Sequence, residues 1–419
     1  MRRQQRYSIW SLVRNALSYH ERWSEAWRSP EPKPGYDVVI IGGGGHGLAT
    51  AYHLARDHGI GNVAVLEKGW LGGGNTGRNT VTVRSNYLRD PSIRFFERSR
   101  RLYEDLSATL NFNVMFSRRG QIDLIQTWAK WRDVRRRSLS MALVDAEYTI
   151  ITPGEIVRRV PLVELDPKAR LPILGGAWHP GAGIARHDAV AWGYARAADA
   201  AGVDIIQNCE VTGIRRAGGR VTGVETTRGT IMAPRISVAV AGHASVVAAM
   251  AGLRLPIETV PLQAFVSAPL KPVLDVVLNC PALHVYLAQT DKGELIIGGG
   301  ADGYTSYAQR GSIHVIEQSV AALIDLMPRL GRVAMLRQWA GMIDLAWDTS
   351  PIISTTPVGG LFVDVGWGSG GFKAIPASGE AFAQLIATGE PPELIRPFGL
   401  DRFLRGRPVL ETAGASNRE

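Results

Sequence analysis

Short, continuous runs of apolar residues recur along the chain, and each run ends in glycine or in an acidic residue. They lie within 37–47, 63–66, 235–243 and 361–368. Runs of this length and composition are typical of buried parallel strands. Helix-forming segments follow or separate them at 48–56, 92–110, 188–201 and 378–388. The alternation predicts a parallel sheet that is covered by helices, as in an α/β nucleotide-binding domain.

Other segments of the chain read as further strands or helices. The region 114–125 reads as strands, 202–206 is a further strand, and 211–231 reads as a hairpin that turns through Ala217-Gly-Gly219. Residues 255–300 are strand-rich, 128–160 are largely helical in pattern, and 313–328 form a helix. We therefore expect a Rossmann-like dinucleotide-binding domain interleaved with a mostly antiparallel β-sheet domain that holds the substrate.

The pattern divides the chain into discontinuous domains. We assign 35–115, 180–255 and 335–405 to the nucleotide-binding domain and 116–179 and 256–334 to the sheet domain. Residues 1–34 form a helical extension, and 406–419 form a tail that we expect to be disordered after Leu410. No internal repeat is visible in the sequence.

The N-terminal extension combines tryptophans and aliphatic residues with basic and polar ones. Its apolar residues are Trp10, Leu12, Val13, Leu17, Trp23 and Trp27. This is the pattern of an amphipathic helix, which the prolines of 29–34 then end. The apolar face has to be buried, either on the protein's own core or on a partner subunit.

Composition narrows the class of protein. A chain of 419 residues with 45% hydrophobic residues is long enough for two closely connected domains. Cys209 and Cys280 have neither the number nor the spacing of a disulfide framework or a metal site, which suits a reducing cytoplasm. The basic N-terminus is not followed by a long apolar segment, so we expect no secretory signal, no membrane span and a cytoplasmic location.

The formal net charge of +9 raises the question of an anionic partner. Part of it lies in Lys130-Trp-Arg-Asp-Val-Arg-Arg-Arg137. No nucleic-acid recognition motif accompanies this run, so we expect no nucleic-acid binding. A solvated helix face, a docking surface for an acidic partner, or an anionic substrate or cofactor accounts for the charge equally well.

The strongest motif follows the first apolar run, in Asp37-Val-Val-Ile-Ile-Gly-Gly-Gly-Gly-His-Gly47. Gly42, Gly44 and Gly47 have the dinucleotide spacing, which permits a tight turn, close approach of a pyrophosphate and close helix–strand packing. The N-terminus of the following helix then faces the phosphates. Glu67 ends the second strand, where a carboxylate binds a ribose hydroxyl, and this favours FAD or NAD over NADP.

Several other segments could carry chemistry. The glycine-rich strand ends at Gly42, Gly242 and Gly366 should converge on one cofactor, because ligands bind at the carboxyl ends of parallel strands. Four candidate side chains stand in or beside loops, where each is either functional or simply solvated: Arg78, Arg84, Lys373 and His187. His243 is as readily explained by crowding near the cofactor as by catalysis. No metal-ligand or Ser/His/Asp pattern is evident.

Taken in order, these motifs resemble the β subunits of heterotetrameric sarcosine oxidases, within the glycine oxidase and D-amino-acid oxidase class of flavoproteins. The resemblance runs from about residue 6 to 403 and is carried by five motifs. They are Ile41-Gly-Gly-Gly-Gly-His-Gly-Leu-Ala-Thr-Ala-Tyr52, Val65-Leu-Glu-Lys-Gly-Trp-Leu71, Arg84-Ser-Asn-Tyr-Leu88, Gly183-Ile-Ala-Arg-His-Asp188 and Gly366-Trp-Gly-Ser-Gly-Gly-Phe-Lys373.

The resemblance implies two flavins and a four-subunit complex. FAD would be non-covalent, consistent with the lack of cysteine in 298–303, and FMN would be bonded to His187 near a subunit interface. Arg84 and Lys373 would be the catalytic pair that holds the substrate carboxylate. The partners would be α-, γ- and δ-type subunits, one of which would use tetrahydrofolate, and the substrate a small N-methyl amino acid, sarcosine first. The expected cofactor-binding residues are Gly42, Gly44, Gly45, Gly47, Glu67, Lys68, Asn75, Thr76, Arg78, Asn79, Val211, Gly242, Gly368, Gly371, Phe372, Lys373 and, for FMN, His187.

Two departures from the family pattern keep the substrate open. Thr82-Val83 stand where some members have two isoleucines, and Gly77 stands where members often have alanine. Two alternatives therefore remain. One is a subunit of a dehydrogenase for N-methylglutamate or another N-methyl amino acid. The other is a flavin-carrying electron-relay subunit that turns over no substrate of its own.

Overall fold

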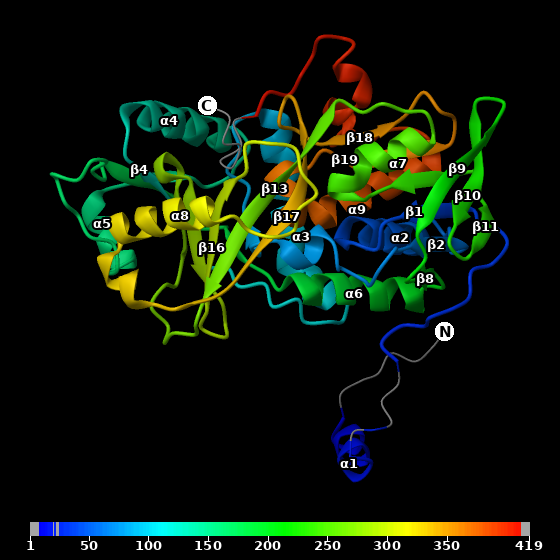
Figure 1. The fold of residues 1–419 in the computed structure, drawn as a ribbon, viewed down its shortest axis with the longest axis horizontal. Helices are drawn as coiled ribbons and strands as arrows, with labels where there is room; N and C mark the ends of the chain where they lie inside the picture. Colours follow the sequence, from blue (N-terminus) through cyan, green and yellow to red (C-terminus); the bar gives the residue numbers. More distant parts are fainter. Residues whose placement is uncertain (1–7, 20, 22–24, 412–419) are drawn as a thin grey trace.

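The computed structural model describes residues 8–19, 21 and 25–411. Two large sheets stand side by side, with helices packed around them (Figure 1). The six-stranded sheet is mainly parallel, and the eight-stranded sheet is mainly antiparallel. The prediction of a mixed α/β fold with a nucleotide-binding sheet beside an antiparallel sheet is confirmed.

The α-helices of the described chain are α1 (Ile9–Leu17), α2 (Gly45–Asp57), α3 (Asp90–Thr109), α4 (Trp128–Ala142), α5 (Pro153–Arg159), α6 (His187–Ala200), α7 (Ala244–Met250), α8 (Ile313–Leu326) and α9 (Gly371–Thr388). Short 3-10 helices include η1 (Asn75–Arg78), η2 (Ala241–His243) and η5 (Gly368–Gly370).

The strands are β1 (Val38–Ile41), β2 (Val63–Leu66), β3 (Thr82–Val83), β4 (Gln121–Ile125), β5 (Thr149–Ile151), β6 (Gly175–His179), β7 (Gly183–Ile184), β8 (Asp204–Ile206), β9 (Val211–Ala217), β10 (Arg220–Thr226), β11 (Gly229–Met232), β12 (Ile236–Val238), β13 (Ile257–Ser267), β14 (Val277–Cys280), β15 (Val285–Gln289), β16 (Leu295–Ala301), β17 (Met335–Ala346), β18 (Ile352–Thr355) and β19 (Leu361–Val365).

The six-stranded sheet has the order β18-β19-β12-β1-β2-β8. Every residue of β1 and β2 is buried because both faces of the sheet are covered. Val38 and Ile40 face a core shared with α2, α3, α6 and α9, whereas Val39 and Ile41 face a second core shared with α7 and β9–β11. Successive side chains of a strand point to opposite faces, and both faces are buried here. Every position is therefore apolar, and the apolar runs are continuous.

The eight-stranded sheet has the order β17-β13-β16-β15-β14-β4-β6-β5. In β4, Ile122 and Leu124 join a core with α5 and α8 on one face. Gln121 and Asp123 alternate with them and therefore point to the opposite face, where they are also buried. Two buried polar residues on one face of a strand indicate that this part of the face meets a polar ligand or network.

Helix α9 begins at Gly371, seven positions before the start that the sequence pattern indicated at 378. The early turns contain Pro376, which has no N–H to donate to the carbonyl of Phe372. The hydroxyl of the buried Tyr103 donates to that carbonyl instead, at 2.6 Å. The helix can therefore start directly after the glycines, and this places Lys373 in its first turn.

Two segments differ from the sequence expectations. Residues 149–151 form strand β5 within the segment expected to be largely helical, because they pair with β6 at the edge of the large sheet. The long strand β17 was not anticipated, and it pairs with β13 over its length. The segment 335–405, assigned above to the nucleotide-binding domain, thus contributes strands to both sheets.

The N-terminal helix α1 stands away from the body of the protein (Figure 1). None of its residues is buried, and Trp10 is 78% exposed. Of the two alternatives for its apolar face, burial on the protein's own core is wrong for 9–17. Trp27 does pack against the core, whereas Trp23 lies outside the described residues.

The C-terminal segment is ordered one residue beyond Leu410, where disorder was expected to begin. Glu411 is 6% exposed, and its carboxylate accepts hydrogen bonds from the N–H groups of Leu88 and Arg89 at 3.1 and 2.6 Å. Residues 412–419 lie outside the described part.

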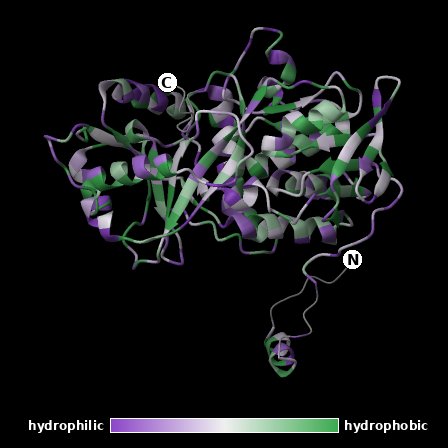
Figure 2. Ribbon diagram, in the orientation of Figure 1, coloured by the Kyte–Doolittle hydropathy of each residue, from purple (hydrophilic) through white to green (hydrophobic). Residues whose placement is uncertain are grey.

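In Figure 2 the ribbon around α7 and α9 is mainly hydrophobic, whereas α4 carries several hydrophilic turns.

Candidate functional site

The turn between β1 and α2 leaves no room for side chains. Gly42 has φ +114°, and a Cβ there would lie 2.3 Å from the carbonyl oxygen of Ala239. A Cβ on Gly47 would lie 2.1 Å from the carbonyl oxygen of Gly42. Both positions therefore require glycine, one for the turn and the other for the approach of α2 to β1. The turn leaves the N-terminus of α2 free to face a ligand.

A cavity of about 400 Å³ opens at this turn. Predicted cofactor residues from four parts of the chain converge on it, which is the arrangement expected at the carboxyl ends of parallel strands. Those that line it are Gly42, Gly44, Gly45, Glu67, Lys68, Asn75, Thr76, Arg78, Asn79, Val211, Gly242, Gly368, Gly371 and Phe372. Gly47, Lys373 and His187 are not among its lining residues: Gly47 packs against the turn, and the other two lie elsewhere, as described below.

Glu67 lies at the end of β2, directly beside the glycine turn. Its carboxylate accepts hydrogen bonds from the N–H groups of Gly43 and Gly69, both at 2.9 Å. The hydroxyl of Thr76 accepts one from the N–H of Gly45 at 3.0 Å. In such turns the hydroxyl and phosphate groups of a dinucleotide meet the protein. The side-chain oxygens of Glu67 and Thr76, which accept hydrogen bonds, lie at these places.

The loop at 69–79 folds over the cavity through contacts with the large sheet. The amide of Asn75 donates to the carbonyl of Met342 at 2.5 Å, and Arg78 donates to the side chain of Gln309 at 2.7 Å. Trp339 donates its indole N–H to the carbonyl of Arg78 at 2.8 Å. The loop is therefore held between the two sheets and can close one side of a bound cofactor.

Sequence reasoning assigned no role to several polar residues of this cavity. His46 lies within the glycine motif, with Nδ1 2.9 Å from a carboxylate oxygen of Asp364. Burial lowers the pKa of His46, but Asp364 outweighs it and the net shift is upward. Burial raises the pKa of Asp344 to about 6, and its Oδ1 has no hydrogen-bond partner in the described structure. The signal in the sequence was a polar residue inside an apolar strand, at Asp344 and Asp364 alike.

A smaller cavity of about 60 Å³ adjoins the large one and shares Asn79, Thr80, Tyr286, Ser369 and Phe372 with it. Its remaining lining residues are Val81, Thr82, Arg84, Gln121, Val277, Asn279 and Lys373. Arg84 and Lys373, which are distant in sequence, thus lie at one site.

The two cations of this cavity are held differently. Arg84 donates to the side-chain oxygen of Asn86 at 2.8 Å and lies over the ring of Tyr87, 5.0 Å from its centroid. Lys373 is 6% exposed and donates to the carbonyl of Ser369 at 2.8 Å. Burial, and then the charge of Arg84, lower the pKa of Lys373 well below its ordinary value. An anion placed between them would relieve both effects.

His187 is the first residue of α6 and lines neither cavity. Its Nε2 lies 3.2 Å from the carbonyl of Gly77, in the loop that covers the larger cavity, and its Nδ1 is buried without a hydrogen-bond partner among the described residues. Burial lowers the pKa of His187. Asp188, which could either orient the histidine or cap the helix, forms an ion pair with Arg186 and accepts from the N–H of Ala189 at 2.8 Å.

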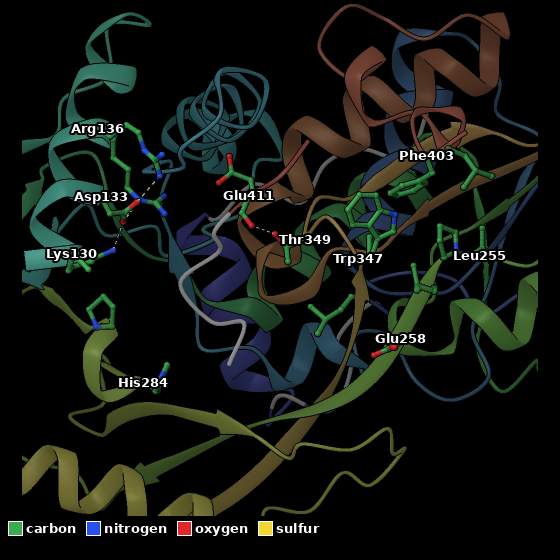
Figure 3. Close-up of a pocket in the computed structure, with 18 of the residues that line it drawn as sticks. Lys130, Asp133, Arg136, Leu255, Glu258, His284, Trp347, Thr349, Phe403 and Glu411 are labelled. Carbon is green, nitrogen blue, oxygen red and sulfur yellow. Dashed lines mark hydrogen bonds and ion pairs between the residues drawn. The ribbon is translucent and has the colours of Figure 1, made fainter. Parts of the chain in front are cut away.

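A third and larger hollow, of about 1350 Å³, lies between α4, the start of β13 and the C-terminal segment (Figure 3). Lys130, Asp133 and Arg136 stand on one wall, and Trp347 and Phe403 on the other. Part of the basic run at 130–137 therefore faces this groove and not a flat surface. The groove contains none of the predicted cofactor residues.

Two features are absent from the part of the chain that the structure describes. Within it, no group of three or more His, Cys, Asp or Glu side chains is arranged to hold a metal ion. None of its helices combines the length and hydropathy needed to cross a lipid bilayer.

Comparison with known proteins places this geometry in context. A family model described as FAD dependent oxidoreductase matches residues 37–385. The chain is 54% identical to sarcosine oxidase subunit beta of Rhodobacter capsulatus, over 98% of this chain and 99% of the relative. It is 51% identical to the protein of the same name in Rhizobium meliloti, over 96% of both chains. Among solved structures, L-proline dehydrogenase from P. horikoshii superposes with a TM-score of 0.82 at 27% identity, covering 90% of this chain and 99% of that one.

Proposed function

The chain belongs to the FAD dependent oxidoreductase family, and we propose that it is the subunit of a multi-subunit sarcosine oxidase in which sarcosine is oxidised. The observation that carries the proposal is the small cavity in which Arg84 and Lys373 meet, joined to the cavity at the dinucleotide turn. The proposal is supported by two relatives named sarcosine oxidase subunit beta, which are 54% and 51% identical to this chain over nearly its full length.

The larger cavity fits FAD. Gly42, Gly44 and Gly45 line it without side chains, and the N-terminus of α2 supplies N–H groups and a positive dipole end for a pyrophosphate. Glu67 is placed to accept hydrogen bonds from the ribose in exchange for those it now takes from Gly43 and Gly69. Bound FAD supplies the oxidised isoalloxazine that accepts a hydride from the N-methyl carbon.

The smaller cavity fits the substrate. Arg84 offers a planar fork and Lys373 a point charge, and together they can neutralise one carboxylate and fix its orientation. Tyr286 and Phe372 belong to both cavities and so lie where substrate and cofactor meet. The cavity of about 60 Å³ can hold a small amino acid such as sarcosine, which is the substrate named by the relatives.

His187 is the proposed attachment point of a covalent FMN. Its lowered pKa favours the neutral imidazole, which is the nucleophilic form, and its Nδ1 is free of hydrogen bonds within the described structure. Its other nitrogen contacts Gly77, in the loop that covers the FAD cavity, so the two proposed flavin sites would share this loop. The rest of the FMN pocket would come from α-, γ- or δ-type partner subunits, one of which would use tetrahydrofolate.

The test is anaerobic reduction of the assembled complex with a panel of amino acids. We expect sarcosine to bleach the flavin absorbance faster and at lower concentration than N-methylglutamate, N-methylalanine or glycine. Preference for N-methylglutamate would favour the dehydrogenase alternative. Both flavins present without bleaching by any N-methyl amino acid would favour an electron-relay subunit and refute the proposal.

A further inference from the structure

A buried carboxylate stands directly behind the small cavity. Asp123 is 3% exposed, and its two oxygens accept hydrogen bonds from four side chains. Asn86 and Tyr148 donate to Oδ2, both at 2.6 Å, and Gln121 and Asn279 donate to Oδ1, both at 2.8 Å. Since two of these donors line the cavity and Asn86 holds Arg84, a single carboxylate organises one wall of the site.

The strand register explains this arrangement. Gln121 and Asp123 are two positions apart in β4, and Asn279 of β14 pairs directly with Asp123. All three side chains therefore point to the same face of the sheet. Tyr286 pairs with Asn279 from the next strand and joins them on that face. The backbone pairing, and not a mobile loop, sets these positions.

The carboxylate also fixes which way each amide is turned. Burial raises the pKa of Asp123, but Lys130, Tyr148, Arg84 and Asn279 outweigh it, so that the net shift is downward and the group is ionised. An ionised carboxylate can only accept, so Gln121 and Asn279 must present their NH₂ groups to it. The amide oxygen of each side chain therefore points away from Asp123.

Those two oxygens are available to a ligand. Neither accepts a hydrogen bond from any of the described residues. Neither is among the buried side-chain atoms without a partner in the described structure, which are His187 Nδ1, Ser237 Oγ and Asp344 Oδ1. Both residues line the cavity that contains Arg84 and Lys373. The cavity thus carries cationic groups for a carboxylate and, on the β4–β14 wall, neutral acceptors.

We propose that the amide oxygens of Gln121 and Asn279 form the subsite that accepts the N–H groups of the substrate amine, with Asp123 as the residue that orients both amides. The inference rests on the proposed function and deepens it. An amide oxygen can accept from the protonated amine and also from the neutral secondary amine, which still has one N–H. In the second case the nitrogen lone pair stays free to assist loss of the hydride.

The subsite also defines a substrate class. Acceptor oxygens backed by a buried anion favour a cationic or N–H-bearing group and oppose a second carboxylate against this wall. The wall therefore selects amines that carry at least one N–H group and a single carboxylate. Methoxyacetate, in which an ether oxygen replaces the amine of sarcosine, keeps the carboxylate but has no N–H to donate.

This pair of ligands gives the test. In the flavin-loaded complex, Asn279→Leu should raise the dissociation constant of sarcosine, obtained from anaerobic reduction rates, by roughly ten- to a hundredfold. The dissociation constant of methoxyacetate, from the change in flavin absorbance, should stay the same. Gln121→Met gives the same measurement on the neighbouring strand in case the first variant folds poorly. Gln126→Met is the matched control, because Gln126 is a buried amide beside the same strands that lines neither cavity.

The outcomes separate the two proposals. If the wild-type complex uses sarcosine and binds methoxyacetate, but both variants keep the wild-type ratio of the two constants, the subsite is refuted and the proposed function stands. The same holds if both ligands weaken equally. If the wild-type complex neither bleaches with sarcosine nor binds methoxyacetate, the proposed function fails and the subsite fails with it.

Discussion

Lys373 lies buried in the same small cavity as Arg84, and the charge of the arginine adds to burial in lowering the pKa of the lysine. Lys373 meets only the carbonyl of Ser369 among the hydrogen-bond acceptors of the described chain. A buried cation beside a second cation is costly, and a bound carboxylate removes that cost. The pair is therefore organised for an anion that comes from outside the protein.

The affinity of the cavity for a carboxylate should fall as the pH rises. The ammonium form of Lys373 binds the anion, and its lowered pKa means that this form is lost at lower pH than for an ordinary lysine. The dissociation constant of methoxyacetate should therefore increase from neutral to alkaline pH. Lys373→Met should bind it about ten- to a hundredfold more weakly at neutral pH and without that pH dependence. A wild-type pH profile in the variant would contradict the assignment.

The same substitution should alter stability in a defined direction. Because the pKa of Lys373 is lower in the folded state, the unfolded chain binds more protons between the folded and unfolded pKa values, and stability rises with pH in that window. Below it, the buried charge destabilises the protein. We expect Lys373→Met to be more stable than the wild type at neutral pH, by thermal unfolding without ligand, and to show a smaller rise toward alkaline pH.

Gly47→Ala should impair FAD retention and the fold together. The new Cβ would lie 2.1 Å from the carbonyl oxygen of Gly42, so α2 has to move away from β1. Such overpacking costs about 1–3 kcal/mol and displaces the N-terminus that faces the phosphates. Gly303→Ala is the control, since a Cβ there meets nothing within 4 Å. Flavin content after dialysis and thermal unfolding measure the two effects; equal behaviour of both variants would argue against the packing role.

The pair between Arg402 and Asp348 should be a major contact of the C-terminal segment. It is bidentate, with both distances 2.8 Å, and both side chains are at most 4% exposed. Arg402→Gln leaves a buried carboxylate without its partner and should destabilise the protein by about 3–5 kcal/mol. Arg405→Gln breaks the exposed pair with Asp401 and should cost about 0.3–0.5 kcal/mol in chemical denaturation.

His187→Ala should remove covalent flavin from the complex and leave FAD in place. The reason is that His187 contacts the outside of the 69–79 loop and does not line the FAD cavity. Fluorescence of the denatured chain on a gel, and the mass of the peptide that contains residue 187, measure the bond. His314→Ala, at an exposed histidine, should retain the signal. An unmodified 187 peptide from wild-type complex that oxidises sarcosine would rule out the attachment.

The exposed apolar face of α1 should bind a partner subunit. Trp10 and Leu17 are 78% and 79% exposed on a helix in which none of the residues is buried by the described part of the chain. Trp10→Asp together with Leu17→Asp should reduce co-purification of the coexpressed subunits, with the flavin content of this chain unchanged. Ile313→Asp, at an exposed apolar position of α8, is the control for added charge. A fully assembled complex of the double variant would show that α1 is not a docking element.

The local parts of the site could be predicted from the sequence because short-range physics determines them. A glycine that must adopt φ +114°, as Gly42 does, and an acid at the end of a buried strand, as Glu67 is, leave a signature within a few residues. The same holds for the apolar runs of β1 and β2, since a strand buried on both faces has no polar positions to spare. These features fixed the α/β class and the position of the nucleotide turn before any contact was known.

Tertiary structure alone decided which distant residues became neighbours. Arg84 and Lys373 share a cavity although they are far apart in sequence, and Lys373 lies there in the first turn of α9, which starts seven positions earlier than its pattern indicated. Asp123 and Asn279 meet because β4 and β14 pair in one register, which no local pattern specifies. Periodicity determines which face of an element is buried, whereas the register and packing of whole elements determine what that face meets, and those depend on the entire chain at once.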